Sequence, residues 1–339
     1  MEKTFGFAII GSGAIAHAHA KAIAQLKGAQ LVGVYGSVAQ QAAEFAQTYS
    51  CKQYDTFQKL LEDPQVDIVS ICTPSGLHAQ YAIDVANAGK HLVTEKPMAI
   101  TTEQLEAMIQ AAQTNGVKAA VIVQKRFSQA VAGVKAAIDG GFLGKIHSAD
   151  CVMRYHRTES YYAQGGWRGT GALDGGGALM NQGIHGVDLV QYLMGGVESV
   201  YAYCKTVSRP IETEDHAYIL AEYCNGAMGM IHSSTVCAPG QPCTITICGE
   251  TGTIVLQEDA ILTWDVEGME RPAQEVTNVA SFRNPMDFPI DNHISQLQDL
   301  VDAIREDRTP AVDLYEGRKA VDIILAAYNS SKTGEKILL

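Results

Sequence analysis

A glycine-rich turn between a short strand and a helix is the feature that most constrains the fold of this chain. Phe5–Ile10 is an apolar run, Gly11-Ser-Gly-Ala-Ile-Ala16 follows it, and residues 14–26 have a helical pattern. In this context G-x-G-x-x-A is typical of a dinucleotide-binding turn, although a glycine turn that binds nothing is the alternative. The helix N-terminus would offer its N–H groups to the phosphates. We predict that the cofactor-binding residues here are Gly11, Ser12, Gly13, Ala14 and Ile15.

The first 120 residues continue this alternation of strands and helices. Strand–helix alternation is typical of a doubly wound α/β fold, a parallel sheet with helices on both faces. Residues 68–72 are continuously apolar apart from Ser70, as expected for a parallel strand that is buried on both faces. The further predicted strands are 30–35, 66–72, His91–Thr94 and 118–123, and the helices are 38–49, 77–88 and 102–115.

After residue 123 the pattern changes to strands that are joined by tight turns. Asn225-Gly226 is a strong hairpin signal, and consecutive strands with short connections indicate an antiparallel sheet. We predict a Rossmann domain at 1–122 that binds NAD(P), and an α+β domain with a large, mostly antiparallel open sheet at 123–339 that binds substrate and forms oligomers. The predicted strands are 145–154, 197–207, His216–Tyr223, 227–234, Thr244–Gly249, 253–257 and 260–264, and the helices are 130–139, 178–194, 293–305 and 315–330.

Composition excludes several classes of function. A formal net charge of −12 and the absence of a Lys/Arg run argue against a nucleic-acid partner. No segment approaches the ~18 apolar residues of a membrane helix, so we expect a cytoplasmic protein without a membrane partner. The eight cysteines suggest free thiols in a reducing compartment, and the spacing of Cys237, Cys243 and Cys248 matches no zinc pattern, so we expect no metal.

The end of the second predicted strand bears on the choice between NAD and NADP. NAD sites usually place an acid there to bind the ribose hydroxyls, but this strand ends in Tyr35-Gly36-Ser37. Gly36 and Ser37 leave space for a 2′-phosphate, to which Ser37 could donate, although no Arg or Lys follows closely. We therefore predict NAD(P), with a slight preference for NADP.

Glu95-Lys96-Pro97 follows the predicted strand His91–Thr94 directly. Ligands of doubly wound sheets gather at the carboxyl ends of the strands, so Lys96 is well placed for chemistry. Glu95 could pair with it, and Pro97 restricts the backbone. A surface ion pair beside a turn is the alternative.

Four motifs together resemble the glucose–fructose oxidoreductase / inositol dehydrogenase (Gfo/Idh/MocA) family. They are the glycine turn, Thr73-Pro-Ser-Gly-Leu-His78, Glu95-Lys-Pro97 and Gly175-Gly-Gly-Ala-Leu-Met-Asn-Gln-Gly-Ile-His185-Gly-Val-Asp188. The resemblance spans nearly the whole chain. It implies that Thr73, Pro74, His78 and Glu95 lie at the cofactor, that Lys96 and His185 are catalytic, and that the protein is a homodimer or homotetramer.

The predicted helix 178–194 carries the second half of the site. Residues 181, 185 and 188 would share one helical face by the i, i+4, i+7 rule. Oxidation of a secondary alcohol needs a base, for which His185 is suited, while Lys96 would favour the developing alkoxide. The family usually has Asp at the position of Asn181, which can bind a substrate hydroxyl or orient His185 but cannot be a base. The alternatives are a core role for His185 and a structural acceptor role for Asp188.

Further candidates lie near the predicted domain junction and the glycine-rich loop. An aromatic side chain beside basic groups suits a sugar ring or an anionic group on it. His293 begins a predicted helix, where a capping role and a ligand role are equally open. The predicted substrate-binding residues are Arg126, Arg154, Trp167, Arg168, Asn181 and His185.

These expectations lead to an NAD(P)-dependent oxidoreductase that transfers hydride to or from a ring hydroxyl or ketone. The substrate would be a sugar, a cyclitol or a sugar nucleotide; the segments 167–170 and 180–183 resemble sugar-nucleotide 3-dehydrogenases. The alternatives are a glycosidase of this fold that uses bound NAD transiently, and a non-catalytic sugar or nucleotide sensor.

Overall fold

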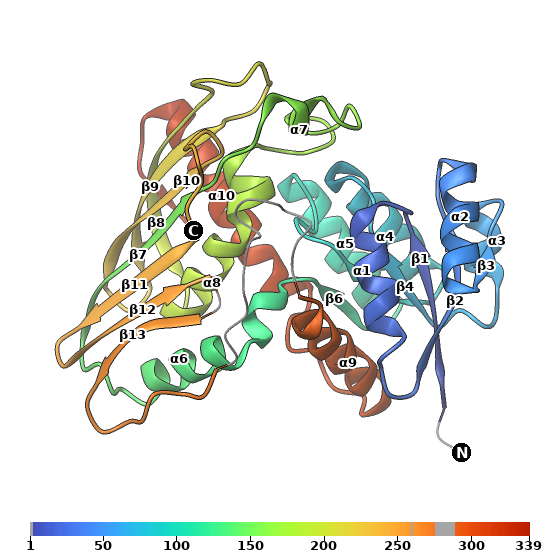
Figure 1. Ribbon diagram of the computed structural model, residues 1–339, viewed down its shortest axis with the longest axis horizontal. Coiled ribbons are helices and arrows are strands. Elements are labelled where there is room, and N and C mark those ends of the chain that lie inside the picture. Colours follow the sequence, from blue (N-terminus) through green and yellow to red (C-terminus); the bar gives the residue numbers. More distant parts are fainter. Residues whose placement is uncertain (1–2, 259, 275–288) are drawn as a thin grey trace. The chain divides into compact units, whose positions relative to one another are not determined.

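The computed structural model describes residues 3–258, 260–274 and 289–339, and the chain forms two compact units (Figure 1). The first unit is Met1–Gln124 with Pro289–Arg318, and the second is Lys125–Phe288 with Lys319–Leu339. This division differs from the expected one in residues 289–318. Leu297, Leu300 and Val301 of α9 (Asp291–Arg305) are fully buried in the core of the first unit, and this burial joins the late segment to it.

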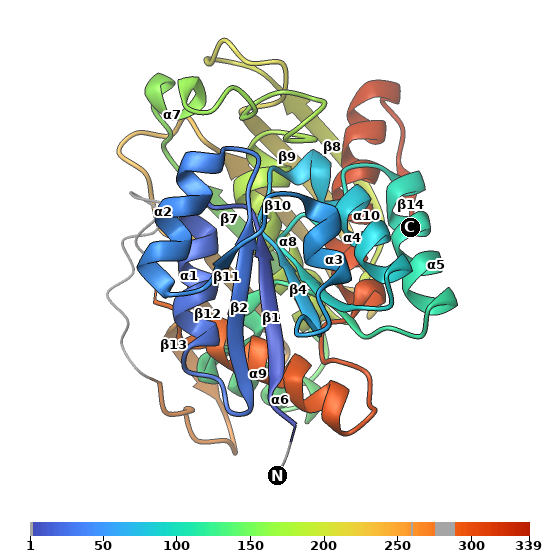
Figure 2. The same cartoon turned by 90° about the vertical axis from the view of Figure 1, so that its right-hand side faces the viewer.

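The first unit contains the predicted parallel sheet, in the order β3-β2-β1-β4-β5-β6. All of its strand pairs are parallel. Figure 2 shows α1 and α2 on one side of β1, β2 and β4, and α4 and α5 on the other. The bounds are β1 Phe5–Ile10, α1 Ala14–Ile23, β2 Ala29–Tyr35, α2 Ala39–Tyr49, β3 Lys52–Gln53, α3 Phe57–Glu62, β4 Ile68–Ile71, η1 Ser75–Leu77, α4 His78–Asn87, β5 His91–Thr94, α5 Thr102–Thr114, β6 Ala119–Val121 and η2 Gln124–Phe127, the last of which runs into the second unit.

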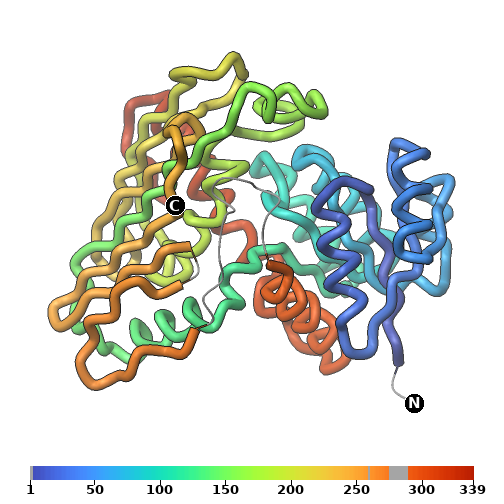
Figure 3. The backbone as a smooth tube through the Cα atoms, in the orientation of Figure 1, coloured from blue at the N-terminus to red at the C-terminus, as the bar shows by residue number. Residues whose placement is uncertain are grey.

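The second unit is built on an eight-stranded sheet in the order β13-β12-β11-β7-β10-β9-β8-β14. Its strand pairs are antiparallel except that β10 runs parallel to β7, so the predicted α+β architecture is confirmed. The tube in Figure 3 follows these strands along the chain. The bounds are α6 Gln129–Asp139, β7 Ile146–Arg154, α7 Glu159–Ala163, η3 Ala178–Gly183, α8 Ile184–Met194, β8 Val197–Lys205, β9 His216–Tyr223, β10 Met228–Ser234, β11 Thr244–Gly249, β12 Gly252–Gln257, β13 Ala260–Val266, α10 Leu314–Thr333, which begins in the first unit, and β14 Ile337–Leu338.

The burial patterns of the two sheets explain the two sequence patterns. Every residue of β1 and β4 is buried, because helices cover both faces of a parallel sheet. Along β9, by contrast, Ala217, Ile219 and Ala221 are buried, whereas Tyr218 and Leu220 are exposed. The second sheet therefore presents one face to the core of its unit and leaves apolar side chains on the other.

The structure differs from the sequence expectations mainly in short elements. β3, α3, α7 and β14 were not predicted, because two to six residues carry too little periodicity. The predicted helix 178–194 is not uniform, since Ala178–Gly183 forms a π-helix before α8 begins at Ile184. All eight cysteines are free, and within the described residues no helix is long and apolar enough to cross a membrane.

Candidate active site

The glycine turn has the geometry that a dinucleotide requires. Gly11 has a φ of +105°, and a Cβ there would overlap the carbonyl oxygen of Cys72. At Gly13 a Cβ would meet nothing within 4 Å, so the backbone is open to a ligand on this side. Gly13 caps α1 without a side-chain hydrogen bond, which leaves the first N–H groups of the helix for an anion. The residues present therefore fit a bound diphosphate.

The end of β2 is close to this turn. A Cβ on Gly36 would lie 3.0 Å from Oγ of Ser12, so a larger side chain at position 36 would crowd the turn. Ser37 is exposed, and the first turn of α2 contains no acidic residue. Gly36 and Ser37, the two residues predicted to lie at the adenosine ribose, are therefore both uncharged.

His78 joins the loops that follow β4 and β5. Its Nδ1 lies 2.7 Å from the carbonyl oxygen of Pro97, and its Nε2 lies 2.8 Å from that of Thr73. The side chain is 1% exposed, so its own contacts are with these two loops. His78 therefore fixes Thr73 and Pro74 relative to the Glu95-Lys96-Pro97 turn.

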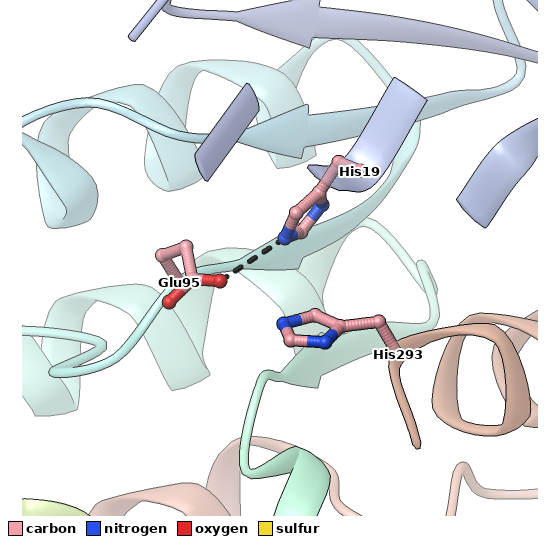
Figure 4. A group of neighbouring side chains, drawn as sticks. All are labelled: His19, Glu95 and His293. Carbon is pink, nitrogen blue, oxygen red and sulfur yellow. Dashed lines mark hydrogen bonds and ion pairs between the residues drawn. The ribbon is translucent and has the colours of Figure 1, made fainter. Parts of the chain in front are cut away.

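Glu95 is buried beside two histidines, His19 and His293, that sequence reasoning did not connect with it (Figure 4). Its Oε1 lies 3.0 Å from Nε2 of His19, and its Oε2 accepts the backbone N–H of Lys96 at 3.2 Å. The ring of His293 packs edge-on against that of His19, with the centroids 5.7 Å apart. His293 therefore contributes to this buried cluster from inside α9, and His19 contributes from the buried face of α1.

In the second unit, three glycines precede the helix that carries Asn181 and His185. A Cβ on Gly176 would overlap the Tyr328 hydroxyl, and one on Gly177 would overlap the carbonyl oxygen of Glu214. The Glu214 carboxylate accepts the N–H groups of Gly177 at 2.9 Å and Leu179 at 2.8 Å, and the Tyr328 hydroxyl donates to it at 2.9 Å. A distant acid therefore caps the start of this helix.

The buried carboxyl group of Glu214 is expected to make the free energy of unfolding depend on pH. Burial raises its pKa from 4.5 to about 7, although the N–H groups of Leu179 and Gly177 and the Tyr328 hydroxyl act in the opposite direction. The folded protein therefore binds a proton that the unfolded chain releases, and this contribution, at most ~3 kcal/mol, is present below pH 4.5 and is lost as the pH rises through 7.

We expect Glu214→Gln, which mimics the protonated acid, to flatten the fall in the free energy of unfolding between pH 5 and pH 8. Urea denaturation at these two pH values measures it. The exposed Glu212, which accepts the N–H of Gly171, provides the control Glu212→Gln. An equal fall in both variants and in the wild type would contradict the assignment.

Asn181 belongs to a chain of side-chain hydrogen bonds. Its amide donates to Asp174 at 2.6 Å, and its oxygen accepts from Gln182 at 2.9 Å. The other oxygen of Asp174 accepts the N–H of Gly169 at 2.8 Å. Asp174 is 1% exposed, so a buried carboxylate that the sequence analysis did not single out links the loop at 169 to the position of Asn181.

The π-helix corrects the expected spacing of Asn181, His185 and Asp188. The i, i+4, i+7 rule assumes a continuous α-helix, but the first six residues of the segment form i→i+5 bonds. The α-helical rule therefore does not hold across Asn181, and the prediction that these three side chains point together stays a prediction. The structure pairs Asp188 with Arg126 at 2.6 and 2.8 Å, with both side chains buried, as expected of a structural acceptor.

Arginines and aromatic rings alternate along the loop between β7 and η3. The Arg168 guanidinium lies 4.7 Å from the Tyr161 ring centroid and 4.8 Å from that of Trp167. Arg157 stacks over Tyr161 as well and donates to Gln182 at 2.7 Å. Arg154, at the exposed end of β7, lies 3.4 Å from the side chain of Gln241. Of the predicted residues, Trp167 and Arg168 contact each other, and Arg157 shares the Tyr161 ring with Arg168.

Comparison with known proteins agrees with this arrangement. The family described as "Oxidoreductase family, NAD-binding Rossmann fold" matches residues 5–123, and the "GFO/IDH/MocA C-terminal domain" matches residues 131–255. The solved structure of the WlbA dehydrogenase from Bordetella pertussis in complex with NADH and UDP-GlcNAcA is 33% identical, with a TM-score of 0.89, and covers 100% of this chain and 99% of that one. The chain belongs to the Gfo/Idh/MocA family.

Two Gfo/Idh/MocA relatives come from Bacillus subtilis (strain 168). The scyllo-inositol 2-dehydrogenase (NAD(+)) is 26% identical over 100% of this chain and 97% of its own length. The scyllo-inositol 2-dehydrogenase (NADP(+)) is 27% identical over 83% and 81%. The Gfo/Idh/MocA chain described here is accordingly an NAD(P)-dependent dehydrogenase that acts on CH–OH groups.

Several residues of this Gfo/Idh/MocA site were not found from the sequence. His19 carried a signal, because a histidine on the apolar face of a helix needs buried partners. Glu214 gave no local signal, because it acts on a helix more than thirty residues before it. Asp174 acts on residues five and seven positions away, but it belongs to none of the motifs that the sequence showed. Their roles depend on tertiary contacts that motif spacing does not encode.

Proposed function

We propose that this enzyme reversibly oxidises a secondary ring hydroxyl of a sugar nucleotide to a ketone. The observation that carries the proposal is the pair of hydrogen bonds made by Asp174. They connect Gly169, in the loop between β7 and η3 that carries Arg168, to Asn181, which precedes His185. The arginines of this loop suit the diphosphate of a sugar nucleotide, and Asn181 suits a ring hydroxyl. The similarity over the whole chain to the dehydrogenase solved with UDP-GlcNAcA supports the same substrate class.

The chemistry assigns a separate task to each proposed catalytic residue. Bound nicotinamide supplies the hydride acceptor for this reaction. His185 accepts the hydroxyl proton, since a histidine can act as a base near neutral pH. The Lys96 ammonium stabilises the developing alkoxide, and Asn181 donates or accepts a hydrogen bond at a neighbouring hydroxyl without acting as a base.

The arginines in and beside the loop between β7 and η3 favour an anionic substrate. Arg168 lies over Trp167 and Tyr161, so its guanidinium sits beside ring faces on which a nucleotide base or a sugar can pack. Arg154 adds an exposed cation at the end of β7. Arg126 is held by Asp188, so we assign it a smaller part in substrate binding than Arg168 or Arg154.

We propose that the enzyme accepts both NAD and NADP, with a slight preference for NADP. Ser37 is exposed beside Gly36, and no carboxylate there would repel a 2′-phosphate. We expect Ser37→Asp to weaken NADP binding at least 10-fold and to leave NAD binding unchanged or stronger, because the new charge faces the 2′ position. Fluorescence titration with each nucleotide measures this ratio, with Ser37→Asn as the uncharged control. Equal losses of affinity for NAD and NADP would show that residue 37 does not face the 2′ position of the ribose.

The remaining proposals concern the two units and assembly. We assign nucleotide binding to the first unit, and substrate binding and self-association to the second. Tyr203, Tyr218, Leu220 and Met228 are 40–63% exposed on the second sheet, and this apolar surface supports a homodimer or homotetramer. Tyr203, Tyr218 and Leu220 lie close together on this surface. Tyr203 of β8 pairs with Tyr218 of β9, and Leu220 is two residues further along β9.

One assay tests the proposed function. The purified enzyme is titrated with NAD and NADP, and a panel of sugar nucleotides, free sugars and cyclitols is then screened for production of NAD(P)H. We expect turnover on a sugar nucleotide with a kcat/KM at least 10-fold above that for the free sugar. Sugar release without net NAD(P)H would indicate the glycosidase, and binding without turnover would indicate a sensor.

A further inference from the structure

We propose that His19 is a positioning residue for Lys96: its imidazolium holds the buried Glu95 carboxylate as an anion, and Glu95 fixes the backbone and the charge of Lys96. The inference rests on the proposed catalytic role of Lys96 for its effect on rate. Its structural basis lies entirely in the first unit, in contacts among α1, β4, α9 and the turn after β5.

Both ring nitrogens of His19 have a partner. Nε2 lies 3.0 Å from Oε1 of Glu95, and Nδ1 lies 2.7 Å from Oγ of Ser70 on β4. The Ser70 hydroxyl in turn lies 3.6 Å from Sγ of Cys72, to which it can donate. A doubly protonated ring satisfies every bond in this chain, because both nitrogens then donate, to a carboxylate and to a hydroxyl oxygen.

Burial makes the charge of this pair matter. His19 is completely buried and Glu95 is 6% exposed, so each ion loses hydration and needs a neighbouring opposite charge or hydrogen bonds. Burial by itself lowers the pKa of His19, but Cys72 and Glu95 outweigh it and raise that pKa to about 10. Burial likewise raises the pKa of Glu95, but His19 outweighs it and lowers that pKa to about 2.

The other titratable groups around the pair leave the proton on His19. From α9, His293 has its pKa lowered to about 4 by burial and then by the charge of His19, so it faces the pair as a neutral ring (Figure 4). At the start of α4, the ring nitrogens of His78 lie within hydrogen-bonding distance of the carbonyl oxygens of Pro97 and Thr73. Lys96 is the remaining cation that acts on Glu95. One imidazolium and one carboxylate therefore form the buried core of this cluster, with the Cys72 thiol group from the end of β4 acting on the imidazolium.

Glu95 transmits the effect to Lys96 in two ways. Its Oε2 accepts the Lys96 backbone N–H at 3.2 Å, which fixes where the lysine leaves the chain. The positive charge of Lys96 favours ionised Glu95, and by reciprocity ionised Glu95 favours charged Lys96. If Glu95 became neutral, the Lys96 ammonium would lose its proton at lower pH. His19 thus sets the protonation of a residue that it need not touch.

The first test compares pH profiles of kcat for three variants of the pair and one control variant. We expect His19→Gln and Glu95→Gln each to lower kcat at least 10-fold and to move the fall of kcat at alkaline pH downwards by about one pH unit, a tenfold change in proton affinity. The double variant His19→Gln/Glu95→Gln should shift no further, because both changes remove the same anion. His17→Gln is the matched control, since His17 lies on α1 but bonds to Tyr49.

The second test does not depend on catalysis. The reactivity of the Lys96 amine towards an amine-acylating reagent is followed against pH by mass spectrometry of its peptide, without substrate. We expect the pKa of this amine to fall in His19→Gln and Glu95→Gln and to stay at the wild-type value in His17→Gln. If these shifts appear but Lys96→Ala retains full activity, the proposed function fails while this inference stands.

Two measurements on the wild-type protein cover variants that fail to fold. Selective 15N labelling of histidine should show His19 doubly protonated at pH 8 and His293 neutral. A neutral His19, unshifted pH profiles in the folded variants, or additive losses in the double variant would each overturn the proposal. A stoichiometric divalent metal in the purified enzyme would overturn it too, because His19 and Glu95 would then be ligands.

Discussion

Replacing Lys96 by alanine is expected to lower kcat by roughly 10³-fold while nucleotide binding persists. The ammonium is proposed to stabilise negative charge that develops only as the hydroxyl proton leaves, so its loss affects the transition state more than the ground state. The proposed diphosphate contacts belong to Gly11, Gly13 and the start of α1, which the substitution does not change. Initial rates of NAD(P)H production and calorimetric titration with both nucleotides measure the two effects separately.

A matched lysine provides the control for that experiment. Lys118 lies in the same unit and pairs with Asp307 at 2.8 Å, at a position with no proposed part in the reaction. Lys118→Ala should keep kcat within about twofold, because its partner Asp307 is exposed to solvent and such pairs contribute little to stability. Normal turnover by Lys96→Ala on a confirmed substrate would remove Lys96 from the mechanism.

His185→Ala is expected to lower kcat by roughly 10²–10⁴-fold through loss of the base. Added imidazole should restore part of the rate, because a small base can enter the space that the side chain leaves. A loss of rate without rescue, accompanied by weaker substrate binding, would instead assign His185 to substrate binding.

The control for this substitution is His147→Ala. His147 is exposed on β7 of the same unit, so its replacement tests whether the loss of any histidine there changes the rate. Its activity should match the wild type with and without imidazole. Stimulation of this control by imidazole would invalidate the rescue experiment.

Most of the fold could be predicted because the two sheets leave different traces in the sequence. β1 and β4 are buried on both faces and read as apolar runs, whereas β9 alternates. The bounds of β1, β5, β9 and β11 are the predicted ones. The membership of α9 could not be predicted, because an amphipathic helix shows which face it buries but not against which partner.

The candidate site could be predicted only where it depends on local geometry. The φ of Gly11 and the open side of Gly13 follow from the turn itself. The π-helix at Ala178–Gly183 could not be foreseen from α-helical spacing, which gives no sign of an i→i+5 bond. The bonds of Glu214 to Gly177 and Leu179 span more than thirty residues, beyond any motif.

The return of residues 289–318 to the first unit has a consequence for folding during synthesis. The ribosome releases all strands of the parallel sheet before residue 125, yet Leu297, Leu300 and Val301 arrive on the order of ten seconds later. Until then the apolar surface beneath α9 has no cover from its own chain. A nascent chain that does not yet contain residues 289–318 is a candidate for chaperone binding. A gene fragment that ends near residue 122 would encode the first unit without part of its core.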